Sequence, residues 1–236
     1  MEIAIPSKGR PGKVKSLTIL PGATLYVPAL EESAYRECGA QSVVPVPNHV
    51  TGITRTRNWI LDNCADPWLV MLDDDVKAAG YVELGVSHAC HRTIRDWPTE
   101  FRRLFELTED LGFRIWGIAT QSAPRAVYPY KPFLWCSYVT ASCMGIRNDT
   151  GIRFDESFPV KEDYELTLRC IVEDGGVMAA RYIYWENSHW TGIGGCCDYR
   201  TQEMERKAIR DLQAKYPGMV RQITRGGSDM SIELTV

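Results

Sequence analysis

The sequence predicts an α/β fold: one Rossmann-like, mostly parallel sheet flanked by helices, followed by a small C-terminal appendage. Strand-like and helix-like segments alternate through the first half of the chain, which is typical of a parallel sheet. The run Trp68–Leu72 is apolar at every position, as expected of a strand buried on both faces. With 236 residues, of which 44% are hydrophobic, the chain can bury one sizeable core.

The expected strands are short β-favouring runs, and Pro6 and Pro47 directly follow two of them. In chain order they are Glu2–Ile5, Thr24–Val27, Gln41–Val46, Trp68–Leu72, Ile115–Thr120, Val139–Ile146, Val177–Trp185 and Ser231–Val236. We assign residues 1–195 to the core and residues 196–236 to an appendage of the same domain, because no linker, repeat or low-complexity run separates them.

The expected helices have apolar residues at helical spacing, and Gly39 stands where a glycine commonly ends the first of them. In the second helix the pattern places Trp59, Ile60 and Leu61 inward and Arg55, Arg57 and Asn58 outward. The helices are Glu31–Cys38, Thr54–Cys64, Thr99–Leu111, Glu162–Asp174 and Thr201–Lys215.

Composition limits the classes of partner. The net charge of −3 excludes a generally basic protein, so contact with nucleic acid requires a local patch. No apolar run approaches the roughly 18 residues of a membrane span, and the N-terminus lacks the core of a signal peptide. The eight cysteines lack a C-x-x-C spacing, and we interpret them as reduced, buried thiols of a cytoplasmic protein.

Three consecutive carboxylates, Asp73, Asp74 and Asp75, directly follow the apolar run Trp68–Leu72. Ligands bind at the carboxyl ends of strands in open α/β sheets. Asp73 and Asp75 are alternate residues and can face the same side, where their hard oxygen atoms suit Mg²⁺ or Mn²⁺ bridged to phosphates. The alternative is a solvated acidic turn.

A second acidic group, Glu162-Asp163, begins the fourth expected helix. A carboxylate there can take the proton of an attacking hydroxyl group while a metal neutralises a departing diphosphate. The alternative is ordinary acidity at a helix N-terminus, which the helix dipole favours.

Other residues are candidates for contacts with a nucleotide. Arg10, Arg55 and Arg57 suit a diphosphate, although each can equally serve as a surface residue. Gly194 and Gly195 belong to a glycine-rich loop whose backbone N–H groups can approach phosphates.

Two blocks of the sequence together resemble GT-A glycosyltransferases. The first is GITRTRN at residues 52–58 followed by WLVMLDDDV, which is similar to the family's Arg-Asn helix and its apolar strand ending in Asp-x-Asp. The second is Phe154-Asp155-Glu156 followed by EDYEL at residues 162–166, in which Glu165 replaces the usual second aspartate. The resemblance covers about residues 3–195 and implies a GT-A type fold.

The resemblance also implies roles for individual residues. Asp73 contacts the nucleoside, Asp75 holds the metal, and Asp163 is the general base of an inverting transfer with Glu162 beside it. The loop Pro6-Ser7-Lys8-Gly9-Arg10 resembles the part that touches the donor's base, and the family implies His189 as a metal ligand. The implied site residues are Asp163 and Glu162 for catalysis; Pro6, Ser7, Arg10, Arg55, Arg57, Asn58, Asp73, Asp74, Gly194 and Gly195 for the donor; and Asp75, Asp73 and His189 for the metal.

A narrower likeness concerns the acceptor. The start IPSKGRP, the segment YWEN and the tail helix before Tyr216-Pro217 resemble phage glycosyltransferases related to the base J glucosyltransferase group. This likeness implies Mn²⁺ or Mg²⁺, a UDP-sugar donor (glucose), a hydroxymethylated pyrimidine in duplex DNA as acceptor, and a location in the host cytoplasm. No obligate protein partner is visible. The alternatives are transfer to a sugar, lipid or protein, and a nucleotidyltransferase or nucleotide-binding module.

Overall fold

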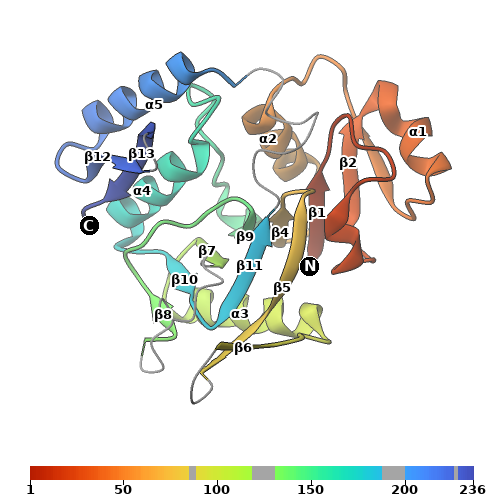
Figure 1. Cartoon of the computed structure of the whole chain (residues 1–236), viewed down its shortest axis with the longest axis horizontal. Coiled ribbons are helices and arrows are strands. Elements are labelled where there is room, and N and C mark those ends of the chain that lie inside the picture. Colours follow the sequence, from red (N-terminus) through yellow and green to blue (C-terminus); the bar gives the residue numbers. More distant parts are fainter. Residues whose placement is uncertain (85–88, 119–130, 188–199, 226–227) are drawn as a thin grey trace.

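The computed structural model describes the chain apart from residues 85–88, 119–130, 188–199 and 226–227, and its centre is an eight-stranded sheet (Figure 1). Strands β3, β2, β1 and β4 are parallel, β9 is antiparallel to its neighbours β4 and β7, β10 is parallel to β7, and β8 is an antiparallel edge. The predicted mostly parallel sheet is therefore confirmed. In sheet order the strands are β3 (Val43–Val46), β2 (Thr24–Pro28), β1 (Glu2–Pro6), β4 (Trp68–Leu72), β9 (Cys143–Arg147), β7 (Ile115–Ile118), β10 (Met178–Ala180) and β8 (Phe133–Leu134).

Helices cover both faces of this sheet, which explains why β4 is apolar throughout. Leu69 and Met71 belong to the core shared with α2 and α4, whereas Val70 and Leu72 belong to the core shared with α1 and α3. Successive side chains of a strand point to opposite faces, so each face needs its own apolar set. The helices are α1 (Glu32–Glu37), α2 (Ile53–Asn63), α3 (Trp97–Asp110) and α4 (Glu162–Asp174).

A smaller sheet, in the order β11 (Ile183–Asn187), β5 (Val76–Leu84) and β6 (Ala89–Arg92), was not predicted. It corrects the expected single strand Val177–Trp185, because the chain leaves the large sheet after β10 and enters the small sheet at β11. Tyr182 lies at the break, where its hydroxyl donates to Glu100 over 2.6 Å. Strand β5 starts directly after the acidic run, and its pairing sets Asn187 opposite Val76.

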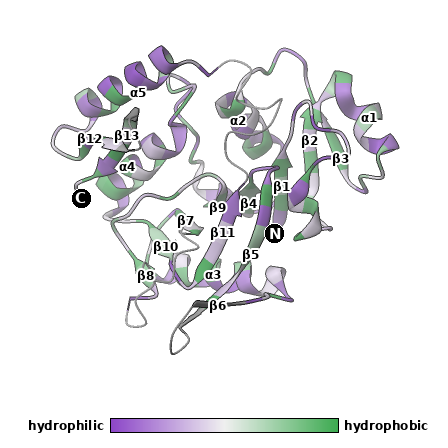
Figure 2. Ribbon diagram, in the orientation of Figure 1, coloured by the Kyte–Doolittle hydropathy of each residue, from purple (hydrophilic) through white to green (hydrophobic). Residues whose placement is uncertain are grey.

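The C-terminal residues, which we call the C-terminal unit (residues 200–225 and 228–236), form α5 (Gln202–Lys215) and the hairpin of β12 (Val220–Arg225) and β13 (Ser228–Leu234). A third apolar core joins this unit to α4 and includes Leu168, Ile209 and Leu212. The ribbon of α5 in Figure 2 carries hydrophilic and hydrophobic residues side by side, as its amphipathic sequence predicts. Helix α5 was predicted from the sequence, whereas strand β12 was not.

Close packing explains Gly145 in β9. A Cβ atom at this position would lie 2.0 Å from the indole nitrogen of Trp116, whose ring is fully buried. Among the described cysteines Cys143 and Cys170 are buried, whereas Cys38 and Cys136 are exposed, so the prediction of buried thiols is wrong for these two. In the described part of the chain, no helix has both the length and the hydropathy needed to span a bilayer.

Candidate active site

The acidic run after β4 and the acidic pair that begins α4 meet at the side chain of Arg57. One arm of its guanidinium lies 3.0 Å from Asp73 Oδ1, and the other pairs with Glu162 Oε1. The Arg57 side chain is only 4% exposed. Arg57 and Glu162 are 105 positions apart in the sequence, so the fold, through α2 and α4, creates this bridge.

The burial of Arg57 and Asn58 corrects the prediction that both point outward. Positions 54, 57, 58 and 61 share one face of α2, and this face meets the segment that leads into α4. Asn58 accepts from the backbone N–H of Phe154 over 2.8 Å and donates to the carbonyl oxygen of the same residue over 3.0 Å. Arg55 is exposed as predicted and pairs with Glu156 at 3.2 Å.

Asp73 and Asp75 face the same side, as predicted from their alternation. The amide nitrogen of Asn187 lies 3.0 Å from Asp75 Oδ1 and 3.5 Å from Asp73 Oδ2. Asn187 itself was missed from the sequence, because only the pairing of β11 with β5 brings it here. Its Oδ1 atom is buried and accepts no hydrogen bond from the described residues. An oxygen acceptor beside two carboxylates is a suitable neighbour for a cation or its bound water.

Asp74 has a different set of partners from the aspartates on either side. Its carboxylate accepts from Ser7 Oγ at 2.6 Å and pairs with Arg10, and Ser7 is also hydrogen-bonded to Tyr35 at 2.8 Å. These contacts hold the loop after β1 against the acidic run. The structure thus brings together three residues assigned to the donor, beside Pro6, which is buried at the end of β1.

Asp163 is fixed by three hydrogen-bond donors. The hydroxyl of Tyr138 and the backbone N–H of Ala141 (3.3 Å) donate to Oδ2, and the backbone N–H of Tyr164 (2.9 Å) donates to Oδ1. The rings of Tyr138 and Tyr164 are stacked with centroids 3.8 Å apart. Burial and the Asp163 charge raise the pKa of Tyr138 well above its usual value, so its hydroxyl stays a donor. The sequence contains no motif that marks Tyr138.

Negative charge exceeds positive charge among these groups. Partial burial raises the pKa of Asp73 to about 7; Arg57 opposes this rise, and Asp75, Asp74 and Asp163 add to it. Burial likewise raises the pKa of Glu162 to about 7, again against the effect of Arg57. A bound cation would relieve this repulsion. Among the described residues no group of three or more His, Cys, Asp or Glu side chains is arranged as a metal site.

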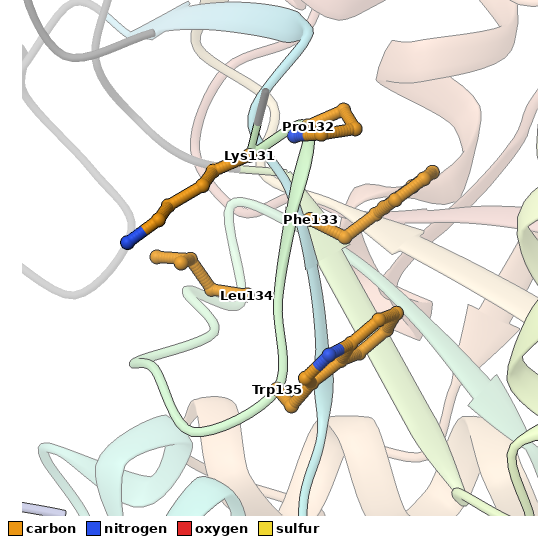
Figure 3. Close-up of a pocket in the computed structure, with 5 residues that line it drawn as sticks. All are labelled: Lys131, Pro132, Phe133, Leu134 and Trp135. Atoms are coloured by element: carbon orange, nitrogen blue, oxygen red, sulfur yellow. The ribbon is translucent and has the colours of Figure 1, made fainter. Parts of the chain in front are cut away.

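Three predicted site residues, His189, Gly194 and Gly195, lie outside the described residues. A hollow of about 400 Å³ is lined by Lys131, Pro132, Phe133, Leu134 and Trp135 (Figure 3). It belongs to the edge strand β8, four positions from β4 in the sheet and therefore roughly 19 Å across it. This aromatic hollow is separate from the carboxylate groups.

Comparison with known proteins identifies the family of the chain. Residues 1–195 match the model of the TET-associated glycosyltransferase family. The curated protein sequences contain no significant match. The chain therefore belongs to the TET-associated glycosyltransferase family.

Solved structures with the same fold share little sequence identity with this chain. A mannosyltransferase from Pyrobaculum calidifontis with GDP-Man and Mn²⁺ is 10% identical, with a TM-score of 0.55 over 90% of this chain and 60% of that one. Glucosyl-3-phosphoglycerate synthase from Mycobacterium tuberculosis with Mn²⁺, UDP and phosphoglyceric acid is 14% identical, with a TM-score of 0.51 over 99% and 85%. S. aureus TarS 1-349 with UDP-GlcNAc is 10% identical, with a TM-score of 0.50 over 90% and 67%. This chain thus spans less than two thirds of the mannosyltransferase, and the likeness establishes the GT-A fold.

Proposed function

We propose that this member of the TET-associated glycosyltransferase family uses a divalent metal and transfers glucose from a UDP-sugar to a hydroxyl acceptor with inversion. The observation that carries the proposal is the bridge by Arg57 between Asp73 and Glu162. This bridge sets the carboxylates that can hold a metal with its diphosphate beside the carboxylates that can take a proton from an acceptor hydroxyl. A transferase needs both functions at one place.

The metal site would be formed by Asp73 and Asp75, with His189 as a further candidate. The convergence of both carboxylates on Asn187, together with the buried Oδ1 of that residue, fits a hard cation. When bound, Mg²⁺ or Mn²⁺ would supply charge stabilisation for the departing diphosphate. The similar folds with GDP-Man and Mn²⁺, or with UDP and Mn²⁺, support this type of donor.

Asp163 would act as the general base. Its carboxylate would take the proton of the acceptor hydroxyl while the new bond to the sugar forms on one side and the bond to the diphosphate breaks on the other. The donors from Tyr138, Ala141 and Tyr164 fix its orientation before substrate binds. A base in a fixed orientation contributes about 10²- to 10⁴-fold to the rate.

For the acceptor we propose a hydroxymethylated pyrimidine in duplex DNA. The likeness of the sequence to DNA-base glycosyltransferases supports this choice, and α5 exposes Arg206 and Arg210 one turn apart. In the same unit Lys207 pairs with Asp211 at 2.5 Å, and Arg221 pairs with Glu233. Exposed arginines of α5 would contact the phosphates of the duplex.

The test is mass spectrometry of nucleosides from hydroxymethylated duplex DNA incubated with the protein, Mn²⁺ and UDP-glucose. The expected product is a hexosylated nucleoside that disappears in EDTA and returns when Mn²⁺ is restored. Release of UDP without a hexosylated nucleoside would contradict DNA as the acceptor and would favour a sugar, lipid or protein acceptor. Full activity in EDTA would contradict the metal.

A further inference from the structure

Lys161, which directly precedes the acidic pair, has a left-handed backbone. Its φ is 58°, and no other non-glycine residue in the described ranges has a positive φ. This conformation costs about 1–2 kcal/mol for a residue with a Cβ atom. Lys161 is also the N-cap of α4, where it supplies no side-chain cap. A strained residue of this kind persists only when its surroundings hold it in place.

The C-terminal unit supplies these surroundings. The Lys161 side chain is 7% exposed, and its ammonium lies 2.9 Å from Glu205 Oε2 of α5. It also donates to the carbonyl oxygen of Met230 in β13 over 3.0 Å and lies 5.4 Å from the ring centroid of Tyr164. A buried ammonium needs such partners, because desolvation of an isolated charge costs several kcal/mol.

Glu205 is held as firmly as Lys161. Its side chain is 3% exposed, and its other oxygen pairs with Arg200. Burial acts to raise the pKa of Glu205, but the hydrogen bonds and charges of Arg200 and Lys161 lower it below the usual value. The carboxylate therefore stays charged and keeps Lys161 in place.

The residue after Lys161 faces the active site. Glu162 pairs with Arg57, and Asp163 follows with its own three donors. The strained residue thus separates two sets of contacts: Lys161 is held by the C-terminal unit, and Glu162 is held by α2. Release of Lys161 would free the first turn of α4, which carries both acidic residues.

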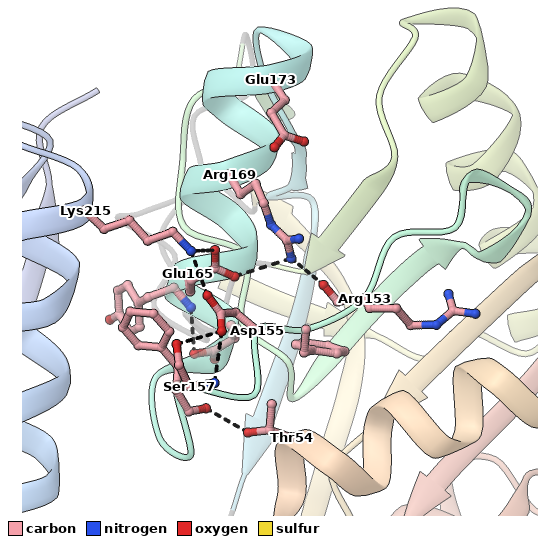
Figure 4. A network of polar contacts seen from close by, with 12 residues as sticks. Thr54, Arg153, Asp155, Ser157, Glu165, Arg169, Glu173 and Lys215 are labelled. Carbon is pink, nitrogen blue, oxygen red and sulfur yellow. Dashed lines mark hydrogen bonds and ion pairs between the residues drawn. The ribbon is translucent and has the colours of Figure 1, made fainter.

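A second group of contacts joins α5 to α4 farther from the acidic pair. Figure 4 shows Lys215 reaching from α5 to Asp155 (2.7 Å) and Glu165 (2.8 Å). Tyr216 donates to the same oxygen of Glu165 over 2.9 Å. These contacts fix the C-terminal unit without involving the Lys161 side chain, so they provide a matched control.

We propose that Lys161 is a positioning residue for Glu162 and Asp163, and that the C-terminal unit is required for catalysis because Glu205 and Met230 hold Lys161 in its left-handed conformation. The proposal rests on the proposed function for the role of Asp163. It assigns a catalytic requirement to residues beyond position 195, where the family match ends.

The experiment compares Glu205→Gln, Lys161→Met/Glu205→Gln and the control Lys215→Met in the full chain. Turnover is measured as UDP release from UDP-glucose with Mn²⁺ and hydroxymethylated DNA, beside thermal melting and calorimetry of UDP binding. Glu205→Gln should lower kcat by about 10- to 100-fold, because small misplacements of catalytic groups have effects of this size. UDP affinity should not change, and Lys215→Met should retain kcat despite a lowered Tm.

The double variant separates positioning from stability. Removal of both charges should restore Tm, since no buried ion is left alone. The kcat should stay low, because no ion pair then fixes residue 161 and the turn that follows it. Recovery of kcat together with Tm would overturn the proposal, as would equal losses of kcat in Glu205→Gln and Lys215→Met. If Glu205→Gln does not fold, the kcat and Tm of the double variant still test the proposal.

Hydrogen exchange gives a result that does not depend on activity. Backbone amides of residues 162–164 should exchange faster in Glu205→Gln than in the wild type, and Lys215→Met should not reproduce the increase. Unchanged exchange would overturn the anchoring of Lys161. A wild-type protein that shows this protection but releases no UDP would instead contradict the proposed function.

Discussion

Arg57→Met is the sharpest test of the bridge between the two acidic groups. Methionine keeps an unbranched chain of similar length but removes the guanidinium that contacts Asp73 and Glu162. The change would leave Glu162, which is 9% exposed, without its cation. Asp73 is 36% exposed and can regain water.

The expected loss follows from these exposures. Removal of one partner from a buried pair typically costs about 3–5 kcal/mol of unfolding free energy. Because only one of the two carboxylates is deeply buried, we expect about 3 kcal/mol. The additional change Glu162→Gln removes the carboxyl group that lost its partner and should restore part of the loss, with a coupling energy of about 1–3 kcal/mol.

The assay is urea denaturation followed by tryptophan fluorescence for the wild type, Arg57→Met, Glu162→Gln and the double variant. The four free energies form a double-mutant cycle. A coupling energy below about 0.5 kcal/mol would mean that Arg57 and Glu162 do not interact, and it would refute the bridge. As a further check, Arg57→Lys should retain little of the stability lost in Arg57→Met, because one ammonium cannot pair with two carboxylates as a forked guanidinium does.

Three further predictions concern other parts of the molecule. Tyr138→Phe should lower kcat about tenfold with donor affinity unchanged in calorimetry, because it removes a hydrogen bond to Asp163 of a kind worth about 1.5–3 kcal/mol; an unchanged kcat would exclude a positioning role. Partial burial of Asp155 acts to raise its pKa, but hydrogen bonds from Lys215 and Ser157 outweigh this effect and lower the pKa to about 2. The stabilisation by this carboxylate is therefore complete above its unfolded pKa of about 4 and is lost as pH falls through 2. Asp155→Asn should therefore cost about 1 kcal/mol at pH 7 in urea denaturation, a figure reduced for exposure, and the difference should shrink between about pH 4 and 2; a pH-independent difference would refute the ion pair. Gly145→Ala should cost about 1–3 kcal/mol or more by overpacking, whereas Gly22→Ala, with no atom within 4 Å of the added carbon, should be near neutral; equal melting temperatures would contradict the packing.

The sequence predicts the central sheet well because the signals are local. Strand β4 and the carboxylates after it are recognisable from an apolar run that ends in Asp73-Asp74-Asp75. The helices α2, α4 and α5 follow from apolar spacing. The small sheet was missed because β5 starts without a turn signal after Asp75 and pairs with a strand far along the chain.

The sequence predicts the carboxylates of the candidate site but not the residues that hold them in place. Arg57 was expected to face solvent because periodicity counts apolar residues, whereas its burial depends on a partner 105 positions away. Asn187 and Tyr138 carry no motif, and only β-sheet pairing and loop packing bring them to the aspartates. The strain at Lys161 is likewise invisible in sequence, since its cause lies in α5 and β13.

The most direct test of the account is the turnover of Asp163→Asn with UDP-glucose, Mn²⁺ and hydroxymethylated DNA. Asparagine keeps the shape and some hydrogen bonds of aspartate but cannot take a proton at neutral pH. We expect a kcat lower by about 10²- to 10⁴-fold, with UDP affinity unchanged in the presence of Mn²⁺. Near-normal turnover by the folded variant would contradict the assignment of Asp163 as the base and the inverting transfer built on it.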